Sequence, residues 1–151
     1  MPHSSSFRLE QFGKRMVELL PQMVRGFAQR ESNYLSRGKI SLPQLWVLEY
    51  LSRRENSPMN KLAQFLRISR PDATNLVDRL ISQDLVGRTG DPGDRRVVRV
   101  HMTSKGKRIL ADIWNQKRRM LVEVFGKISP KDRAQYLCTL EQVVAILGGK
   151  P

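Results

Sequence analysis

Apolar residues recur at every third or fourth position through most of the chain, which is the pattern of amphipathic helices. The first such stretch begins after Ser4–Ser6 and is expected to form a helix that reaches the mid-thirties. Its apolar positions are Leu9, Phe12, Met16, Leu19, Leu20, Met23 and Phe27. Pro21 lies inside this stretch and has no backbone N–H donor, so we expect a kink or a break there.

Three shorter helices are predicted next, in close succession. Ser41 is a good N-cap and is followed by Leu42-Pro43, which suits a first helical turn. Ser57-Pro58 repeats this cap-plus-proline signal and predicts a short third helix through Leu66. A tight connection then leads into a fourth helix from about residue 70 to residue 83. The apolar stripe of this fourth helix consists of Ala73, Leu76, Val77, Leu80 and Ile81.

After Asp84 the period of the pattern changes from about 3.6 to two, which indicates strands. Residues 85–89 and 96–102 read as two strands, and the second alternates apolar with polar positions. The dense turn signal Gly90–Asp94 separates them, so the two strands form a hairpin with a polar, basic tip.

Two long helices complete the pattern. Thr103 caps a helix through about Gly126, and Ser129-Pro130 opens the last helix, which closes at Gly148-Gly149. The predicted fold is therefore mainly α, of the α+β winged helix-turn-helix class, with about six helices and a two-stranded β wing.

Charge narrows the class of partner. The 151 residues include 27 Lys and Arg against 14 Asp and Glu, a net charge of +13, which favours a polyanion such as nucleic acid or an anionic membrane surface. The basic residues are not segregated opposite one apolar helix face, so membrane binding is disfavoured. No apolar run approaches the roughly 20 residues of a membrane-spanning helix. Residues 1–6 lack a signal-peptide pattern, so we expect a cytoplasmic protein.

Residues suited to catalysis or metal binding are sparse. The single cysteine, Cys138, excludes an intrachain disulfide, and His3 and His101 lie far apart with no further ligand at metal spacing. No phosphate loop, nucleophile elbow or zinc-protease motif occurs. We therefore expect no enzyme, no cofactor and no metal. Cys138 itself is either a small buried apolar residue or, less in keeping with its position on a helix, a redox group.

The order of two short helices followed by a basic hairpin points to duplex DNA. An α-helix fits the major groove, and Asn and Arg can contact adenine and guanine edges there. Arginines at a hairpin tip suit the adjacent minor groove. The candidate DNA-binding residues are Lys61, Ser69, Arg70, Thr74, Asn75, Arg79, Arg88, Arg95 and Arg96. Asp94 is expected to orient a wing arginine by ion pairing. The competing interpretation is a helical protein–protein adaptor, in which the winged helix docks a partner.

The stretch from Asp72 to Gly106 resembles the signature of the multiple-antibiotic-resistance regulator (MarR) family of winged-helix transcription factors. The matching positions are Ala73, Asn75, Leu80, Ile81, Leu85-Val86, Asp94-Arg95-Arg96 and Thr103-Ser104-Lys105-Gly106. Two positions depart from it. Asp72 stands where the family prefers a small or hydroxyl residue, and Asp84 stands where it prefers glycine, at a point where a backbone conformation easy for glycine is expected.

The resemblance implies a homodimer that binds a pseudo-palindromic operator, commonly as a repressor released by a small phenolic or anionic effector. It divides the chain into an N-terminal dimerisation helix (1–40), a DNA-binding domain (41–103) and C-terminal dimerisation helices (104–151). Apolar stripes that a small DNA-binding domain cannot cover agree with a dimer, although they could also pack within one subunit. The interface candidates are Phe7, Leu9, Phe12, Leu137, Leu140, Val143, Val144 and Leu147. Met23, Trp46 and Tyr50 either line an effector pocket or belong to the core.

Overall fold

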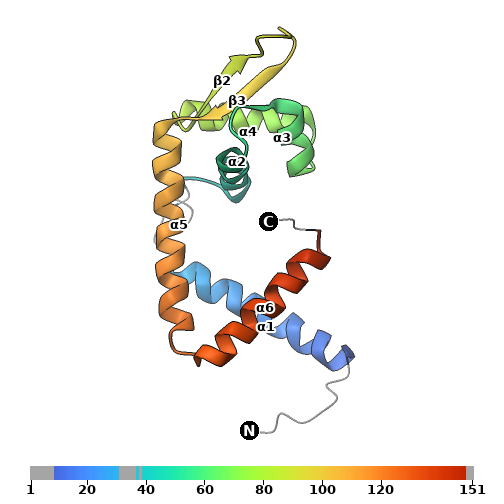
Figure 1. The fold of residues 1–151 in the computed structure, drawn as a ribbon, viewed down its shortest axis with the longest axis vertical. Coiled ribbons are helices and arrows are strands. Elements are labelled where there is room, and N and C mark those ends of the chain that lie inside the picture. Colours follow the sequence, from blue (N-terminus) through green and yellow to red (C-terminus); the bar gives the residue numbers. More distant parts are fainter. Residues whose placement is uncertain (1–8, 31–36, 38, 149–151) are drawn as a thin grey trace. The chain divides into compact units, whose positions relative to one another are not determined.

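A computed structural model describes residues 9–30, 37 and 39–148. These residues form the mainly α, winged helix-turn-helix fold that the sequence predicts (Figure 1). The elements are α1 (Leu9–Arg30), α2 (Leu42–Arg53), β1 (Ser57–Pro58), α3 (Met59–Leu66), α4 (Arg70–Ser82), β2 (Val86–Gly90), β3 (Val98–Met102), α5 (Ser104–Phe125) and α6 (Pro130–Ile146). The chain divides into two compact units, residues 1–116 and 117–151, and α5 runs from the first into the second.

The helix starts follow the predicted caps. The Ser41 hydroxyl accepts from the Gln44 N–H at 3.4 Å, and the Gln44 side chain accepts from the Ser41 N–H at 2.8 Å, which completes a capping box. The Thr103 hydroxyl accepts from the Gly106 N–H at 3.0 Å at the start of α5. Ser129 caps α6 by accepting from the Asp132 N–H. Four N–H groups at a helix start have no partner within the helix, so side-chain oxygens in these positions determine where each helix begins.

The sequence expectation for the start of the third helix is wrong. Ser57-Pro58 does not cap α3 but forms the short strand β1, and α3 begins at Met59 with no side-chain cap. The reason is that Ser57 is buried and its hydroxyl pairs with the Tyr50 hydroxyl at 3.0 Å, so it is not available to the helix. Of the kink or break expected at Pro21, the break does not occur, because α1 continues through that residue.

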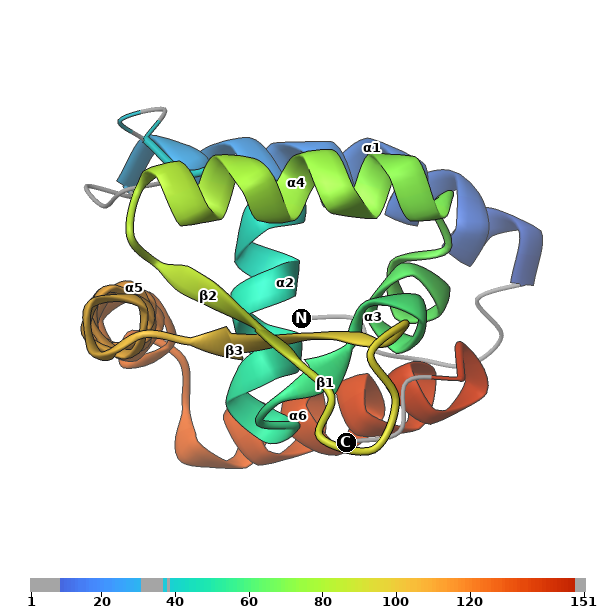
Figure 2. The same cartoon turned by 90° about the horizontal axis from the view of Figure 1, so that it is seen from above.

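The sheet has three strands in the order β1-β3-β2, all antiparallel, rather than the two strands of the wing alone. β3 is the central strand. Val100 on β3 pairs with Ser57 on one side and with Arg88 on the other. Figure 2 shows the sheet from above, with α3 near β3 and α4 near β2. The wing hairpin, which follows α4, is therefore also paired with β1, the segment that precedes α3.

The core of the first unit lies between α2, α3, α4, the sheet and the beginning of α5. Its most deeply buried side chains are Leu48, Leu51, Leu62, Leu80, Leu85, Ile113, Val47, Val77 and Val100. Gly106 permits the close approach of α5, because a Cβ atom there would lie 2.1 Å from the Leu85 carbonyl oxygen. The predicted apolar stripe of the fourth helix is confirmed in its main members, since Ala73, Val77 and Leu80 are fully buried.

The long helices α1 and α6 contain no buried residue. Their exposed apolar side chains include Leu9, Phe12, Val17, Leu19, Leu20, Met23 and Val24 on α1 and Tyr136, Leu137, Leu140, Val143, Val144 and Ile146 on α6. Leu147, just after α6, is exposed as well.

Cys138 is also exposed, so the expectation of a buried cysteine is wrong for the single chain. Phe7, another interface candidate, lies outside the described residues. Over the part of the chain that the structure describes, no helix is long and apolar enough to cross a membrane.

Candidate nucleic-acid interface

The turn between α3 and α4 is set by one residue with a positive φ. Arg67 adopts the left-handed conformation (φ 53°) after the last turn of α3. The N–H groups of Arg67 and Ile68 then donate to the carbonyls of Gln64 and Ala63, both at 3.2 Å. These bonds occupy carbonyls that the end of a helix would otherwise leave without partners. The result is the tight connection that the sequence predicts, three residues long and followed directly by α4.

Ser69 starts α4 and has a structural role there. Its hydroxyl accepts from the Asp72 N–H at 3.2 Å and donates to the Asp72 carboxylate at 2.5 Å. Asp72, the first of the two departures from the family pattern, is therefore the acidic partner of an N-terminal cap. An acid in the first turn is also favoured by the helix dipole. The structure thus accounts locally for both Ser69 and Asp72.

The exposed side of α4 consists of two rows of residues. Helical spacing places Arg70, Thr74 and Asp78 (i, i+4, i+8) in one row, and Asp72, Asn75 and Arg79 (i, i+3, i+7) in another. We call these the wing-side row and the open row. All three residues of the open row are exposed, whereas Thr74 is half-buried. The two rows meet different surroundings, because the wing lies against the first.

Arg88 fastens the wing to the wing-side row. Its guanidinium forms an ion pair with the Asp78 carboxylate at 2.7 Å and donates to the Thr74 carbonyl at 3.3 Å. The side chain of Arg88 is 31% exposed. This arginine, a candidate DNA contact from sequence, is engaged with the protein itself. Its position links strand β2 to the middle of α4.

The wing turn is organised by Asp91, a residue that the sequence analysis missed. One oxygen of its carboxylate accepts from the N–H groups of Gly93 (2.8 Å) and Asp94 (3.2 Å), and the other accepts from the Arg99 side chain. Arg99 also donates to the Asn56 carbonyl at 2.9 Å, which ties the wing to the loop before β1. An aspartate that bonds to the backbone two residues later is a common turn-forming arrangement, and the Asp91-Pro92-Gly93 sequence carries that signal.

The prediction that Asp94 forms an ion pair with a wing arginine is wrong. The Asp94 carboxylate accepts from the backbone N–H of Arg96 at 2.9 Å, and it forms no ion pair within residues 9–30, 37 and 39–148. The reason is local geometry, because the carboxylate is used to close the turn. The ion pair of the wing is formed by Asp91 and Arg99 instead. Asp94 shapes the turn that carries Arg95 and Arg96.

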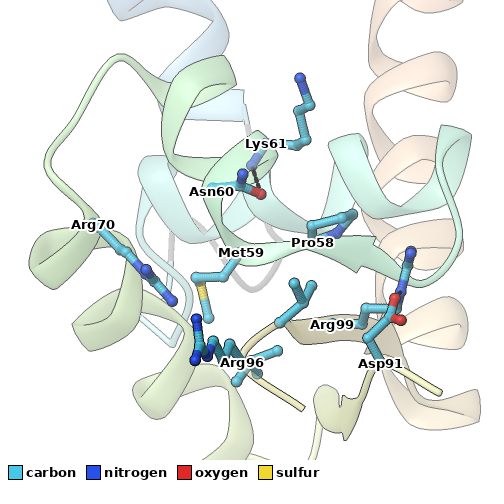
Figure 3. A pocket seen from close by; sticks show the side chains of 10 residues that line it. Pro58, Met59, Asn60, Lys61, Arg70, Asp91, Arg96 and Arg99 are labelled. Atoms are coloured by element: carbon cyan, nitrogen blue, oxygen red, sulfur yellow. Dashed lines mark hydrogen bonds and ion pairs between the residues drawn. The ribbon is translucent and has the colours of Figure 1, made fainter. Parts of the chain in front are cut away.

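A pocket of about 300 Å³ opens between the wing and the start of the helix-turn-helix. Lys61 from α3, Arg70 from α4 and Arg96 from the wing line it, together with the Asp91–Arg99 pair. Figure 3 shows the side chains of Arg70 and Arg96 extending toward each other near Met59. Four cations and one carboxylate give this pocket a net charge of +3. Three candidate residues from three separate segments are thus brought around one space.

The proposed effector residues are not equivalent in the structure. Tyr50 is buried, its ring packs on Phe65 with centroids 4.7 Å apart, and its hydroxyl bonds to Ser57. Trp46 and Met23 keep 44% and 39% of their surface exposed. Tyr50 therefore belongs to the core, which was the alternative interpretation.

Asp84, the second departure from the family pattern, has a φ of 59°. The expectation of a backbone conformation easy for glycine is thus confirmed. Aspartate is among the residues that tolerate this conformation better. The Asp84 N–H donates to the Ile81 carbonyl at 2.8 Å, and its own carbonyl accepts from the Thr103 hydroxyl at 2.7 Å. No group of three or more His, Cys, Asp or Glu side chains in the described part of the chain could hold a metal ion.

The electrostatics of the wing give a pH prediction. The Arg99 hydrogen bond, followed by the bond from the Gly93 N–H, holds the pKa of Asp91 below its ordinary value of 3.8. A lowered pKa means that the folded wing favours the charged carboxylate, so its stabilisation is present above the unfolded pKa and is lost as the pH falls through the lowered value. We expect the amide protons of Gly93 and Asp94 to be protected from hydrogen exchange until that acidic range, and D91A to lose this protection at every pH.

The control for that measurement is D94A, which removes only the acceptor of the Arg96 N–H. It should expose the Arg96 amide and leave those of Gly93 and Asp94 protected. Equal protection of Gly93 and Asp94 in D91A and in the unsubstituted chain would contradict the role assigned to Asp91.

Comparisons with known proteins agree with this geometry. A family model described as the MarR family matches residues 39–97. YsmB of Bacillus subtilis, an uncharacterised HTH-type transcriptional regulator, is 28% identical over 106 residues, which cover 70% of this chain and 73% of YsmB. A MarR-like transcriptional regulator from Thermotoga maritima (TM0816) is 27% identical with a TM-score of 0.74, covering 90% of this chain and 96% of that one.

Streptococcus pneumoniae FabT, solved in complex with DNA, has the same fold with a TM-score of 0.76 at 20% identity, covering 89% of this chain and 96% of FabT. YsmB and TM0816 are both named as transcriptional regulators, in agreement with a regulatory rather than an enzymatic protein. The helix-turn-helix and the wing lie largely within the residues that the family model matches. Residues 39–97 match the MarR family of winged helix-turn-helix transcriptional regulators, and the chain as a whole resembles proteins of that family.

Proposed function

We propose that this protein binds a specific, pseudo-palindromic duplex as a homodimer, represses transcription there, and is released from the DNA by a small molecule. The observation that carries the proposal is the attachment of the wing to α4 by Arg88, at 2.7 Å from Asp78. This contact fixes the arginine-bearing hairpin beside a helix whose open row is exposed and polar. A reading helix and a neighbouring basic hairpin are the two parts that major- and minor-groove contact require.

The chemistry of the exposed residues supports binding to duplex DNA. Asn75 and Arg79 on the open row are residue types that make paired hydrogen bonds to adenine and guanine edges. Lys61, Arg70 and Arg96 surround the basic pocket and are suited to the sugar–phosphate backbone. Arg95 is exposed in the wing turn, where the negative potential of a narrow minor groove would attract it. FabT, a protein of the same fold, has been solved with DNA.

The structure gives Arg88, Ser69 and Thr74 different parts in the proposal. Arg88 is occupied by Asp78 and the Thr74 carbonyl, and the Ser69 hydroxyl is occupied by Asp72. We therefore assign Arg88 to holding the wing and Ser69 to starting the helix. The Thr74 hydroxyl remains a candidate for a DNA contact at the edge that faces the wing.

The exposed apolar side chains of α1 and α6 support a homodimer. Large exposed apolar areas on a protein of this size mark interaction surfaces. A second copy of the chain is the favoured partner, since a two-fold symmetric dimer would present two reading helices to the two halves of a pseudo-palindrome. Leu137, Leu140, Val143 and Val144 on α6 are the candidates for the centre of this interface.

The effector and the repressor role rest on the behaviour of the family. A second pocket, of about 230 Å³, lies within the first unit between α2, β3 and α5. Its presence supports the proposal of a small-molecule effector. Met102, Leu110 and Trp114 supply apolar lining, and the Lys107–Glu55 ion pair, at 2.9 Å, stands at its edge. A single-ring phenol or carboxylate has the size and chemistry for such a space. A cytoplasmic location is part of the same proposal.

The DNA-binding part is tested by salt dependence. The logarithm of the binding constant for a random-sequence duplex pool should fall linearly with the logarithm of salt concentration, because each phosphate contact releases counterions. R70A and R96A should each weaken binding to every sequence by roughly tenfold and reduce the salt slope by about 1. The measurement is fluorescence anisotropy over a salt series.

R119A is the matched control, since it removes an equal charge from an exposed position of α5 outside the pocket. It should leave the slope unchanged. A salt slope of zero for the unsubstituted chain would remove duplex DNA as the partner and favour the adaptor interpretation.

The dimer is tested by substitutions on α6. L140D together with V144D places two charges one turn apart on the exposed apolar side and should convert a dimer to a monomer, because each charge would be desolvated at the interface. Sedimentation equilibrium measures the mass. Q142D, an exposed position on the opposite side of α6, should remain dimeric. A monomeric unsubstituted chain at micromolar concentration would rule the homodimer out.

A further inference from the structure

Asp72 is an exposed acid on the surface that the proposed function directs at a polyanion. It lies on the open row of α4, in register with Asn75 and Arg79. A carboxylate repels phosphate, so a position facing DNA is unfavourable for it unless the carboxylate meets a hydrogen-bond donor. The structure shows which donors Asp72 already has within the protein, and how much of its acceptor capacity remains.

The carboxylate of Asp72 is held in place but not neutralised. The Ser69 hydroxyl donates to Oδ2 at 2.5 Å, and the Asp72 N–H donates back to that hydroxyl at 3.2 Å. An ionised carboxylate has about four acceptor sites, so this bond leaves most of them open. Across the described residues, Asp72 takes part in no ion pair. Its charge therefore faces solvent on a side chain that is already fixed.

Asp78, the other acid on the exposed side of α4, is in the opposite situation. Its carboxylate is paired with Arg88 at 2.7 Å and lies on the wing-side row. The structure thus cancels one acidic charge of the helix and leaves the other without a cation. An unpaired carboxylate on the open row would weaken the attraction of α4 for every duplex, regardless of sequence. Such a group is compatible with tight binding only where the DNA supplies a donor.

The major groove presents two amino donors, N4 of cytosine and N6 of adenine. The adenine amino group lies beside the N7 acceptor of the same base, which repels a carboxylate, so the cytosine amino group suits an isolated carboxylate better. The guanine edge presents only acceptors, O6 and N7, and would repel it. We propose that Asp72 is a specificity-determining residue, whose carboxylate accepts a hydrogen bond from a cytosine amino group in each half-site and disfavours duplexes without it. This inference rests on the proposed DNA-binding function and adds to it the base that one residue reads.

The chain contains a matched control for the structural part of this role. Ser129 and Asp132 form the same arrangement at the start of α6, where the hydroxyl donates to the carboxylate at 2.6 Å and accepts from the Asp132 N–H at 3.2 Å. D132N therefore removes the same charge from the same helical position, in the second unit. Any effect of D72N that D132N shares comes from capping or net charge rather than from base recognition.

The experiment selects bound sequences from a random duplex pool with the unsubstituted chain, D72N, D72E and D132N. Anisotropy titrations then compare the best duplex with single-base variants of it and with random duplex. For the unsubstituted chain we expect one position in each half-site to require cytosine. D72N should lose that preference, bind random duplex more tightly, and show a ratio of specific to random affinity about tenfold smaller. D72E, which keeps the carboxylate, should keep the cytosine preference in weaker form.

The outcomes separate the two levels of the proposal. If the unsubstituted chain selects no sequence, the proposed function fails and the role of Asp72 fails with it. If it selects a motif that D72N selects unchanged, with D72N and D132N showing the same affinities, then DNA recognition stands and Asp72 is a helix cap only. Loss of the preference in D72E as in D72N would also count against recognition by the carboxylate. Thermal unfolding of D72N and D132N shows whether the loss of the cap is comparable in the two helices.

Discussion

The central strand β3 is the constraint on which the arrangement of the first unit depends. Val100 is fully buried and stands in register with Ser57 of β1 and with Arg88 of β2. β1 leads directly into α3, and β2 follows α4, so one buried position on β3 fixes both ends of the helix-turn-helix against the wing. Because the side-chain period of a strand is two, a slip of one residue would move Val100 out of the core and reverse the faces of the whole hairpin.

The contacts of the wing follow from this register. Arg88 is placed where its guanidinium reaches Asp78 and the Thr74 carbonyl, and Arg99 is placed where it reaches both Asp91 and Asn56. Arg88 and Arg99 thus hold the basic hairpin in position, while Arg95 and Arg96 lie exposed in its turn. The positive charge of the wing therefore has two separate uses. One part positions the hairpin, and the other is available to a ligand.

The features predicted correctly from sequence are those determined by neighbouring residues. Ser41, Thr103 and Ser129 cap helices through bonds to residues three positions away, and the periodicity of α4 directly identifies its buried side. The strained conformation at Asp84 was also local, since it follows from the position between a helix and a strand. Local signals of this kind give the order of the elements and hence the fold class.

The features that sequence missed depend on partners far along the chain. Serine is a residue type that often caps helices, but Ser57 forms a strand because it pairs with Val100 and bonds to Tyr50. An arginine in a basic hairpin is a residue type that often contacts DNA, but Arg88 is engaged by Asp78 and the Thr74 carbonyl of α4. The ion pair of the wing was assigned to Asp94 instead of Asp91 because both lie in the same turn, and only the geometry shows which one reaches Arg99.

The division of α4 into a wing-side row and an open row leads to the proposal that the open row and the wing turn together contact duplex DNA. The most direct measurement is the change in backbone amide chemical shifts of the isotopically labelled protein on addition of a selected duplex. The largest changes are expected at residues 69–79 and 91–97. Changes concentrated around Trp114 and the surface of α2, with α4 unaffected, would contradict it.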